Sequence, residues 1–392
     1  MQRKTYATIN GDILTENVKE IINKYPDYEY YFGVVKNNAY HHGTKSVLDL
    51  IKGGVNYLAV SSLEEAIKVR KYTSDTPILC LEPIHLDYIM DAINNNITLT
   101  IESLEYTKEL LKMDLYDTLK IHLAIDTGMH RLGFFDSKEL KEAYELLKEN
   151  SHILIEGVFS HFATSGVMDP YFDKQVNTFL EITKSIPLKD IPIVHMGRSL
   201  TLVNHPKLSF CNGIRLGIIL YGFSQSRKDG KSLQSKLRKL KRSWLQKKYK
   251  CSKTILENDL SLKTAMELYT EVMSVRSVHK NEVVGYNTHK IEEDGYILTL
   301  PIGYADGVNK NFKYVYINGE YLKIVGDCMD MLLIFSPKKI PVGTKVEIFG
   351  SHIPISSVCK VLGINAYHLF NQISNRVVRV HIHENEEEEI TY

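Results

Sequence analysis

The sequence lacks the features that mark membrane-spanning, nucleic-acid-binding and secreted proteins. Its 48 basic and 47 acidic residues leave a formal net charge of +1, which favours neither nucleic acid nor a membrane surface as a partner. None of its apolar runs approaches the roughly 18 residues that a transmembrane helix needs. Its first residues are too polar for a signal peptide. We therefore expect a cytoplasmic protein with no transmembrane segment and no nucleic-acid partner.

Cysteine is also scarce, since only 5 of the 392 residues are cysteine and they lie far apart. No CxxC motif and no Cys/His pair has the spacing of metal ligands, so we expect reduced thiols and no metal site. The apolar content of 44% and the charged content of 24% are typical of a soluble globular protein. The length predicts two domains and a large core.

Short apolar runs alternate with segments of helical periodicity over the first part of the chain. Eight such runs occur, at residues 30–36, 56–60, 77–81, 97–101, 120–126, 156–161, 192–197 and 213–222. Alternating strands and helices predict a parallel sheet. Eight strands predict an α/β fold of the (β/α)8 TIM-barrel type, in which chemistry takes place at the carboxyl ends of the strands. We assign residues 1–226 to this barrel.

The pattern of predicted secondary structure changes after about residue 260. The later segments are rich in β-formers and contain Asn-Gly and Asp-Gly pairs, which are typical of tight turns. This pattern predicts a mostly β C-terminal domain over residues 261–392. The acidic run Glu386–Glu389 is interpreted as a solvated tail, with pairing to the basic segment 227–250 as the alternative.

Residues 227–260 are expected to form a basic amphipathic insert between the two domains. Within 227–250, eleven residues are basic and one is acidic, while leucines and the single tryptophan recur at helical spacing. The favoured interpretation is a peripheral helix whose apolar stripe docks on the barrel. The alternative is peripheral contact with an anionic membrane surface.

The segment VVKNNAYHHG (34–43) is the most informative part of the sequence because it places Lys36 at the exit of an apolar strand. A partly desolvated amine there suits a covalent bond with a carbonyl cofactor. The segment resembles the cofactor-lysine motif of the alanine racemase family, usually read as VVKANAYGHG, with Asn37 and His41 as departures. The resemblance implies that Lys36 binds pyridoxal 5'-phosphate and serves as the base on one face of the substrate. It also implies that Tyr40 contacts the phosphate.

Two further barrel segments resemble the same family. HLAIDTGMHRLGF (122–134) is similar to HLKVDTGMGRLGF, which implies that Arg131 hydrogen-bonds the cofactor and lies near the substrate carboxylate. The family often has a carbamylated lysine where this chain has Ala124, so Arg131 needs another support, such as a bound anion. GVFSHFATSG (157–166) is similar to GIFTHFATAD and implies that His161 packs beside the cofactor ring.

The last barrel segments supply the expected phosphate and ring contacts. HMGRSLTLV (195–203) is a weaker match to HCANSAASL. It implies that Ser199 binds phosphate, with Arg198 in place of the family's asparagine. CNGIRLGIILYG (211–222) resembles FNMVRFGIAMYG and implies that Arg215 faces the pyridine nitrogen. A guanidinium cannot readily give up its proton, so the ring nitrogen would stay unprotonated. The resemblance also implies a phosphate cradle from two backbone amides, those of Gly217 and Ile218.

Three segments of the C-terminal domain extend the resemblance. EVVGYNTHK (282–290) is similar to KVSYGATY and implies that Tyr286 is the base on the second face. A tyrosine has an ordinary pKa of about 10, so this role needs a lowered pKa or a hydrogen-bond partner. PIGYADG and VGDCMDM match family signatures and imply substrate contacts from Tyr304 and Met329. In the family these three residues complete the site of the other subunit, so the resemblance implies a head-to-tail homodimer.

One departure bears on the substrate. QISNRVVRV (372–380) resembles CTISYRVPRI, but Asn375 replaces the family's tyrosine beside the substrate side chain. Asparagine is smaller and can hydrogen-bond a hydroxyl, which makes serine a plausible substrate. The resemblance therefore predicts an alanine racemase that supplies D-alanine for peptidoglycan precursors. The alternatives are a serine or dual racemase, a decarboxylase of similar architecture, and a non-catalytic protein that binds pyridoxal phosphate.

Overall fold

The computed structural model describes residues 3–164, 170–223, 236–237, 240–241, 243–244, 247–248, 260–286, 289–383 and 386–390. The chain forms two compact units. The first, here called the barrel unit, comprises Thr15–Asn37 and Val47–Leu262. The second, the C-terminal unit, comprises Met1–Leu14, Asn38–Ser46 and Lys263–Tyr392.

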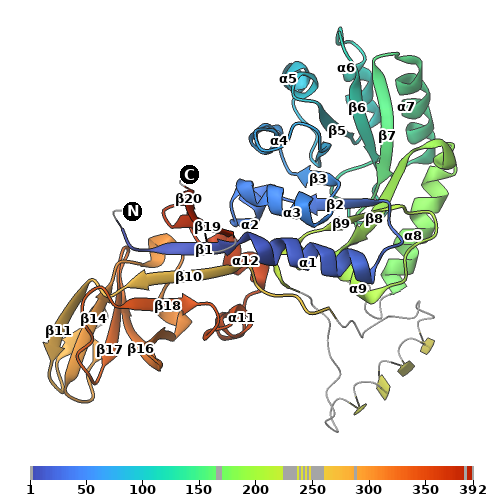
Figure 1. Cartoon of the computed structure of the whole chain (residues 1–392). Coiled ribbons are helices and arrows are strands. Elements are labelled where there is room, and N and C mark those ends of the chain that lie inside the picture. Colours follow the sequence, from blue (N-terminus) through green and yellow to red (C-terminus); the bar gives the residue numbers. More distant parts are fainter. Residues whose placement is uncertain are drawn as a thin grey trace. The chain divides into compact units, whose positions relative to one another are not determined.

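A closed parallel barrel forms the core of the barrel unit (Figure 1). Its strands, in spatial order, are β2 (Tyr30–Val34), β3 (Tyr57–Val60), β4 (Ile78–Cys80), β5 (Ile97–Ile101), β6 (Leu119–Ala124), β7 (Ile153–Phe159), β8 (Ile193–Arg198) and β9 (Gly213–Leu216). The barrel closes where β9 pairs with β2, with Leu216 opposite Gly33. Each of the eight apolar runs overlaps one of these strands, so the prediction of an eight-stranded barrel is confirmed.

Helices alternate with the strands along the chain, and several begin at a residue whose side chain caps the first turn. They are α1 (Gly11–Lys24), α2 (Lys36–Tyr40), α3 (Val47–Gly53), α4 (Leu63–Arg70), α5 (Ile89–Asn94), α6 (Leu104–Leu110), α7 (Ser137–Glu149), α8 (Pro170–Thr183) and α9 (Ser199–Asn204). Short 3-10 helices cover Thr44–Ser46, Leu86–Tyr88, Leu188–Asp190 and Ile218–Tyr221. In α7, Asp136 caps the first turn by accepting from two backbone amides, and Leu140, Ala143 and Leu147 are buried. That i, i+3, i+7 spacing is the apolar stripe of a helix that covers a core.

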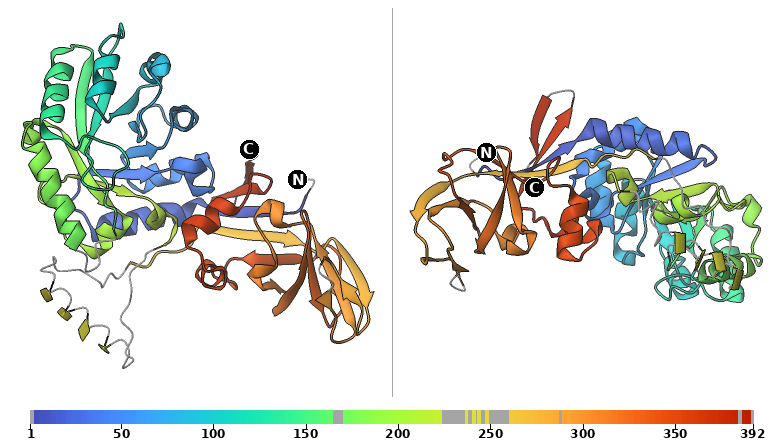
Figure 2. Two further views of the ribbon diagram at one scale, coloured as in Figure 1. Left: turned by 180° about the vertical axis from the view of Figure 1, so that it is seen from behind. Right: turned by 90° about the horizontal axis from the view of Figure 1, so that it is seen from below.

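The C-terminal unit is built on a ten-stranded sheet of order β11-β14-β17-β16-β15-β18-β10-β1-β19-β20. Figure 2 shows this sheet from two further sides. Its strands are β1 (Tyr6–Asn10), β10 (Met266–Glu271), β11 (Ser274–Val278), β14 (Gly295–Leu300), β15 (Tyr314–Ile317), β16 (Glu320–Asp327), β17 (Leu332–Ser336), β18 (Lys345–Phe349), β19 (Val378–His383) and β20 (Glu386–Ile390).

Beyond residue 263, the described part of this unit also contains a short hairpin, two helices and two 3-10 turns. They are β12 (Val283–Val284), β13 (His289–Lys290), α11 (Ile355–Leu362), α12 (Ala366–Gln372), Tyr304–Asp306 and Lys310–Phe312. The β15–β16 hairpin turns at Asn318 and Gly319, whose φ angles are 46° and 90°. An Asn-Gly pair with two positive φ angles is the turn that the sequence predicts. The expectation of a mostly β C-terminal domain is confirmed.

The first strand of the chain belongs to the C-terminal unit, although the sequence-based boundaries group residues 1–226 as one barrel domain. Tyr6 in β1 lies opposite Tyr269 of β10 and opposite Val378 of β19. Ala7 and Ile9 are fully buried there, so β1 completes the sheet between two strands that are distant in sequence. The boundary at residue 226 stays a prediction, because residues 224–235 lie outside the described residues.

Two expectations about charged segments are wrong in the part of the chain that the structure describes. Leu237, Leu240 and Trp244 of the basic insert are more than half exposed, so this stripe is not buried on the barrel. Most other residues of 227–260 lie outside the described residues. The acidic run is not a free tail, because β20 pairs antiparallel with β19. Strand pairing uses backbone groups, so an acidic sequence can occupy a sheet edge.

The described helices include none that is both long enough and apolar enough to cross a membrane.

Candidate active site

The predicted cofactor residues of the barrel unit gather at one end of three neighbouring strands. Lys36 lies two residues beyond β2, Arg215 lies within β9, and Ser199 directly follows β8. Strand β9 pairs with both β2 and β8. Because the carboxyl ends of parallel strands share one end of a barrel, the fold brings these three side chains to the same end.

The turn after Lys36 has an unusual backbone. Five consecutive residues without a glycine, Asn37 to His41, have φ angles between 51° and 62°. A left-handed helical conformation costs roughly 1–2 kcal/mol per residue. Such strain persists only where surrounding structure holds it, and it is concentrated at functional sites. The sequence analysis did not foresee this conformation, because only the two asparagines of this turn tolerate it well.

A carboxylate from α4 holds the start of this turn. Glu65 Oε1 accepts from the Asn37 backbone amide at 2.6 Å, and its Oε2 accepts from the Ser61 amide at 3.0 Å. Lys36 itself is half-buried. The sequence analysis did not single out Glu65.

Arg215 is buried, with 3% of its surface exposed. Its guanidinium donates to His195 Nδ1 at 2.5 Å and to the carbonyl oxygens of Ser160 and Met196 at 2.6 and 3.2 Å. It also lies 3.2 Å from His161 Nδ1. Burial lowers the pKa of Arg215 to about 9, so the group is still a cation at neutral pH. The site therefore contains a buried positive charge whose acceptors are carbonyl oxygens and imidazole nitrogens.

A chain of hydrogen bonds leads from Arg215 into the barrel. His195 Nε2 lies 2.9 Å from His122 Nδ1, and His122 Nε2 lies 3.3 Å from Glu156 Oε2. A guanidinium only donates, so His195 Nδ1 must accept and its Nε2 must carry the proton. By the same logic His122 accepts at Nδ1 and donates to the carboxylate. Two neutral imidazoles thus link the arginine cation to Glu156.

The pKa shifts agree with this assignment. Burial lowers the pKa of both His122 and His195, and Arg215 adds to the effect at each. Burial alone would raise the pKa of Glu156, but hydrogen bonds from His122 and Tyr57 outweigh it, so its pKa is lowered. Neutral histidines and an ionised carboxylate follow. The sequence analysis did not single out these groups, because a histidine on an apolar strand is usually an ordinary core residue.

His161 and Arg131 line one small pocket together with Ala124, Asp126 and Ser160. Burial lowers the pKa of His161 well below its ordinary value, and the nearby Arg215 contributes. His161 is therefore neutral. The structure thus places Arg131 and Ala124 of one predicted segment and His161 of another in the same pocket.

Ser199 connects the ends of β8 and β9. Its buried hydroxyl oxygen accepts from the Gly217 amide at 2.9 Å, and Ile218 begins the next 3-10 helix. Hydroxyl groups and backbone amides at strand ends are suited to phosphate oxygens. With the Lys36 amine and the Arg215 cation at the same barrel end, this donor set fits pyridoxal 5'-phosphate.

The other predicted site residues belong to the C-terminal unit. Tyr40 ends α2 and is buried, with its ring 5.7 Å from that of Tyr367. The backbone joins Ala305 to Met329, with an N–H···O distance of 2.9 Å, which holds Tyr304 close to Met329.

The remaining two predicted residues of this unit are exposed. Tyr286 has 72% of its surface exposed. Asn375 is also exposed, and Arg376 beside it donates to Asp330 at 2.6 Å. Asn375 therefore lies near the Met329 loop within this unit.

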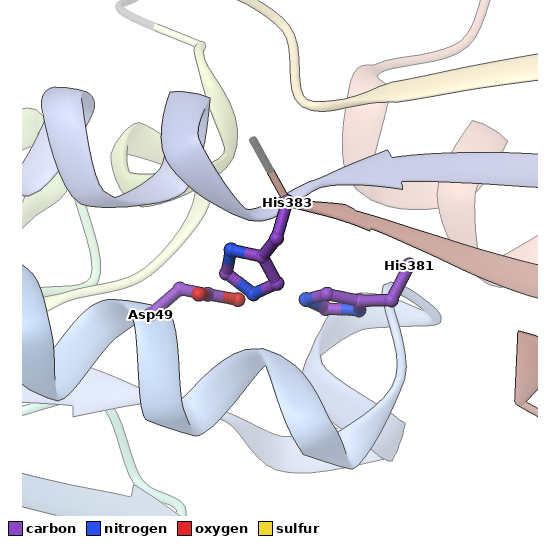
Figure 3. Close-up of side chains that lie close together, drawn as sticks. All are labelled: Asp49, His381 and His383. Atoms are coloured by element: carbon purple, nitrogen blue, oxygen red, sulfur yellow. The ribbon is translucent and has the colours of Figure 1, made fainter. Parts of the chain in front are cut away.

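Titratable side chains also occur away from these residues. Figure 3 shows His381 and His383, which both extend from β19; their ring centroids are 5.3 Å apart. His383 Nδ1 lies 3.6 Å from the Asp12 carboxylate. The figure also labels Asp49, which lies on α3 of the barrel unit. The two histidines are part of the sheet around β1 and β19.

Two family descriptions match this chain, one for each of its halves. The family description "Alanine racemase, N-terminal domain" matches residues 9–225, and "Alanine racemase, C-terminal domain" matches residues 265–381. The alanine racemase of Ligilactobacillus salivarius is 32% identical over 97% of this chain and 98% of its own length.

Solved structures show the same likeness. An alanine racemase of Clostridium difficile superposes with a TM-score of 0.85 at 32% identity, covering 99% of this chain and 98% of that one. The alanine racemase of Bacillus anthracis with bound L-Ala-P gives a TM-score of 0.83 at 31% identity, covering 100% and 98%. With both family domains matched in order and relatives aligned over nearly the full length, this chain belongs to the alanine racemase family.

Proposed function

We propose that this chain is the subunit of an alanine racemase, a pyridoxal-phosphate enzyme that interconverts L- and D-alanine. One observation carries the proposal: both domains of the family match along nearly the whole chain. The lysine at the carboxyl end of β2 and the phosphate-binding groups after β8 and β9 agree with it. The bound cofactor would supply an electron sink for the charge left when the α-proton is removed.

We assign the cofactor contacts to the barrel residues and Tyr40. Lys36 would hold the cofactor covalently, and Ser199, Tyr40 and the amides of Gly217 and Ile218 would hold its phosphate. Arg215 would face the ring nitrogen, because a buried group that only donates leaves that nitrogen as an acceptor. His161 and Arg131 would complete the contacts, with Arg131 also near the substrate carboxylate.

We assign the proton transfers to two residues. Racemisation needs a proton removed on one face of the α-carbon and returned on the other, so a base is needed on each face. Lys36 would serve one face and Tyr286 the other. The two lie in different compact units of the chain, so the assignment rests on the resemblance of their motifs and is open to test.

A homodimer follows from the same assignment. Tyr286, Tyr304 and Met329 are each more than half exposed in the single chain, although the proposed chemistry requires them beside a cofactor. A head-to-tail partner that receives these residues into its own site would cover them. We further propose that the enzyme acts in the cytoplasm and supplies D-alanine for peptidoglycan precursors.

Racemisation of L-alanine and L-serine, measured side by side with added pyridoxal phosphate, tests the proposal. The relatives described above are alanine racemases, so we expect alanine to turn over much faster. If serine equals or exceeds alanine, Asn375 determines the substrate pocket and the chain is a serine or dual racemase. If neither amino acid reacts although Lys36 carries the cofactor, the chain is a binding protein or acts on another substrate.

A further inference from the structure

The carboxylate of Glu65 joins two chain segments at the carboxyl end of the barrel. One oxygen accepts from the amide of Asn37, the residue directly after Lys36, and the other accepts from the amide of Ser61. Both donors lie just beyond strands, since β2 ends at Val34 and β3 at Val60. Glu65 therefore connects the exits of two neighbouring strands.

The position of this contact along the chain is informative. The ladder between β2 and β3 continues as far as the Val35 amide, which donates to the Ala59 carbonyl at 2.9 Å. Beyond it the backbone turns into the left-handed conformation that begins at Asn37. The Asn37 amide is the first donor of the strained turn, and its acceptor is a side chain. Before Lys36 the backbone is held by strand pairing, and after Lys36 it is held by the Glu65 side chain.

Helix capping does not explain this arrangement. Ser62 is the N-cap of α4, and its hydroxyl oxygen accepts from the Glu65 amide. In a capping box, the third helical residue would return its carboxylate to the amide of the N-cap residue itself. Here the carboxylate passes the N-cap residue and reaches Ser61 and Asn37. The start of a helix also favours an acidic side chain at this place.

We propose that Glu65 is a positioning residue for Lys36. Glu65 holds the peptide that follows Lys36 and so fixes the direction in which the Lys36 side chain extends beyond the end of β2. The same contact stabilises the left-handed turn that begins at Asn37. The proposal rests on the proposed function for the identity of the group that Lys36 binds. The clamp itself is a property of the protein without cofactor and can be tested separately.

The variant Glu65→Gln is the sharpest perturbation. An amide has one accepting oxygen, so glutamine can keep one of the two hydrogen bonds while its NH2 group faces the other donor. Glu64→Gln is the matched control. Glu64 lies in the same first turn of α4, is exposed, and carries the same charge.

Hydrogen exchange in the cofactor-free protein is the first measurement. Asn37 is exposed, yet its amide should be protected in the wild-type protein, and Glu65→Gln should raise its exchange rate by about tenfold or more. Glu64→Gln should leave that rate unchanged. The proposal is overturned if the wild-type Asn37 amide exchanges at the rate of an open peptide, or if both variants behave alike.

The second measurement is the binding of pyridoxal phosphate. We expect Glu65→Gln to lower the affinity for the cofactor and the rate at which borohydride traps it on Lys36, each by about tenfold. Equal trapping in both variants would overturn the positioning role, even if exchange shows a clamp. If the wild-type protein does not bind the cofactor on Lys36, the proposed function fails, while the exchange experiment still decides the clamp.

Discussion

Replacing Glu156 by glutamine is the perturbation that best tests the buried hydrogen-bond chain behind Arg215. Glu156 Oε2 accepts from the Tyr57 hydroxyl at 2.5 Å and lies 3.3 Å from both Thr98 Oγ1 and His122 Nε2. Glutamine has nearly the same shape, so packing is kept. It removes the charge that the two histidines connect to the arginine.

The magnitude follows from the change in hydrogen-bond strength. A bond to a charged group contributes about 1.5–3 kcal/mol, and a neutral one contributes about 0.5–1.5 kcal/mol. Each hydrogen bond whose acceptor changes from a carboxylate to a neutral amide therefore contributes roughly 1 kcal/mol less to stability. With Tyr57 and His122 as the two main donors, the free energy of unfolding should fall by about 2 kcal/mol at neutral pH.

The effect should depend on pH. Burial opposes ionisation of Glu156, but the hydrogen bonds from His122 and Tyr57 prevail, so its pKa is lower in the folded protein. Such a group stabilises the fold above the unfolded pKa of about 4.3, and the contribution is lost as the pH falls through the folded pKa. The difference between wild type and Glu156→Gln should thus be largest near neutral pH and shrink below about pH 4.

Urea unfolding at about pH 7 and at about pH 3, at one protein concentration, measures both quantities. Glu149→Gln is the control, because Glu149 is exposed at the end of α7 and should change stability by less than about 0.5 kcal/mol. The reasoning is refuted if Glu156→Gln is as stable as wild type at neutral pH. A loss of equal size at both pH values would also refute it, because the charge would then not be responsible.

Three further substitutions test other parts of the account. Gly157→Ala places a Cβ 2.6 Å from the His122 ring, so we expect a loss of about 1–3 kcal/mol in urea unfolding; unchanged stability would contradict the packing described. Tyr286→Phe should spare cofactor binding and remove proton abstraction from one enantiomer, seen as unequal α-proton exchange of L- and D-alanine; equal losses would argue against two bases. Asn375→Tyr should lower serine turnover relative to alanine by about tenfold or more, and an unchanged ratio would remove Asn375 from the substrate pocket.

Much of the barrel could be predicted from the sequence because its strands are buried on both faces. Runs such as PILCL (77–81) are then nearly continuous in apolar residues and alternate with segments of helical periodicity. Ser62 and Asp136, whose residue types favour helix starts, cap α4 and α7. The cofactor lysine could be predicted because it follows such a run and stands in a motif that resembles one family.

The remaining features depend on contacts that are distant in sequence. Strand β1 joins β10 and β19, which lie more than 250 residues further along the chain, and no local pattern shows this pairing. His122, His195 and Glu156 come from three different strands, and each alone resembles an ordinary core residue. The left-handed turn after Lys36 contains no glycine, so the usual signal for positive φ angles is missing.

Exchange of the α-proton of L-alanine in deuterated water, by the wild-type protein and by Lys36→Ala with added pyridoxal phosphate, tests the central claim most directly. The account predicts that the wild-type protein incorporates deuterium and forms D-alanine, while the variant does neither at a comparable rate. A Lys36→Ala variant that racemises alanine as fast as wild type would contradict the assignment of Lys36. A wild-type protein that binds the cofactor but exchanges no α-proton would contradict the proposed reaction.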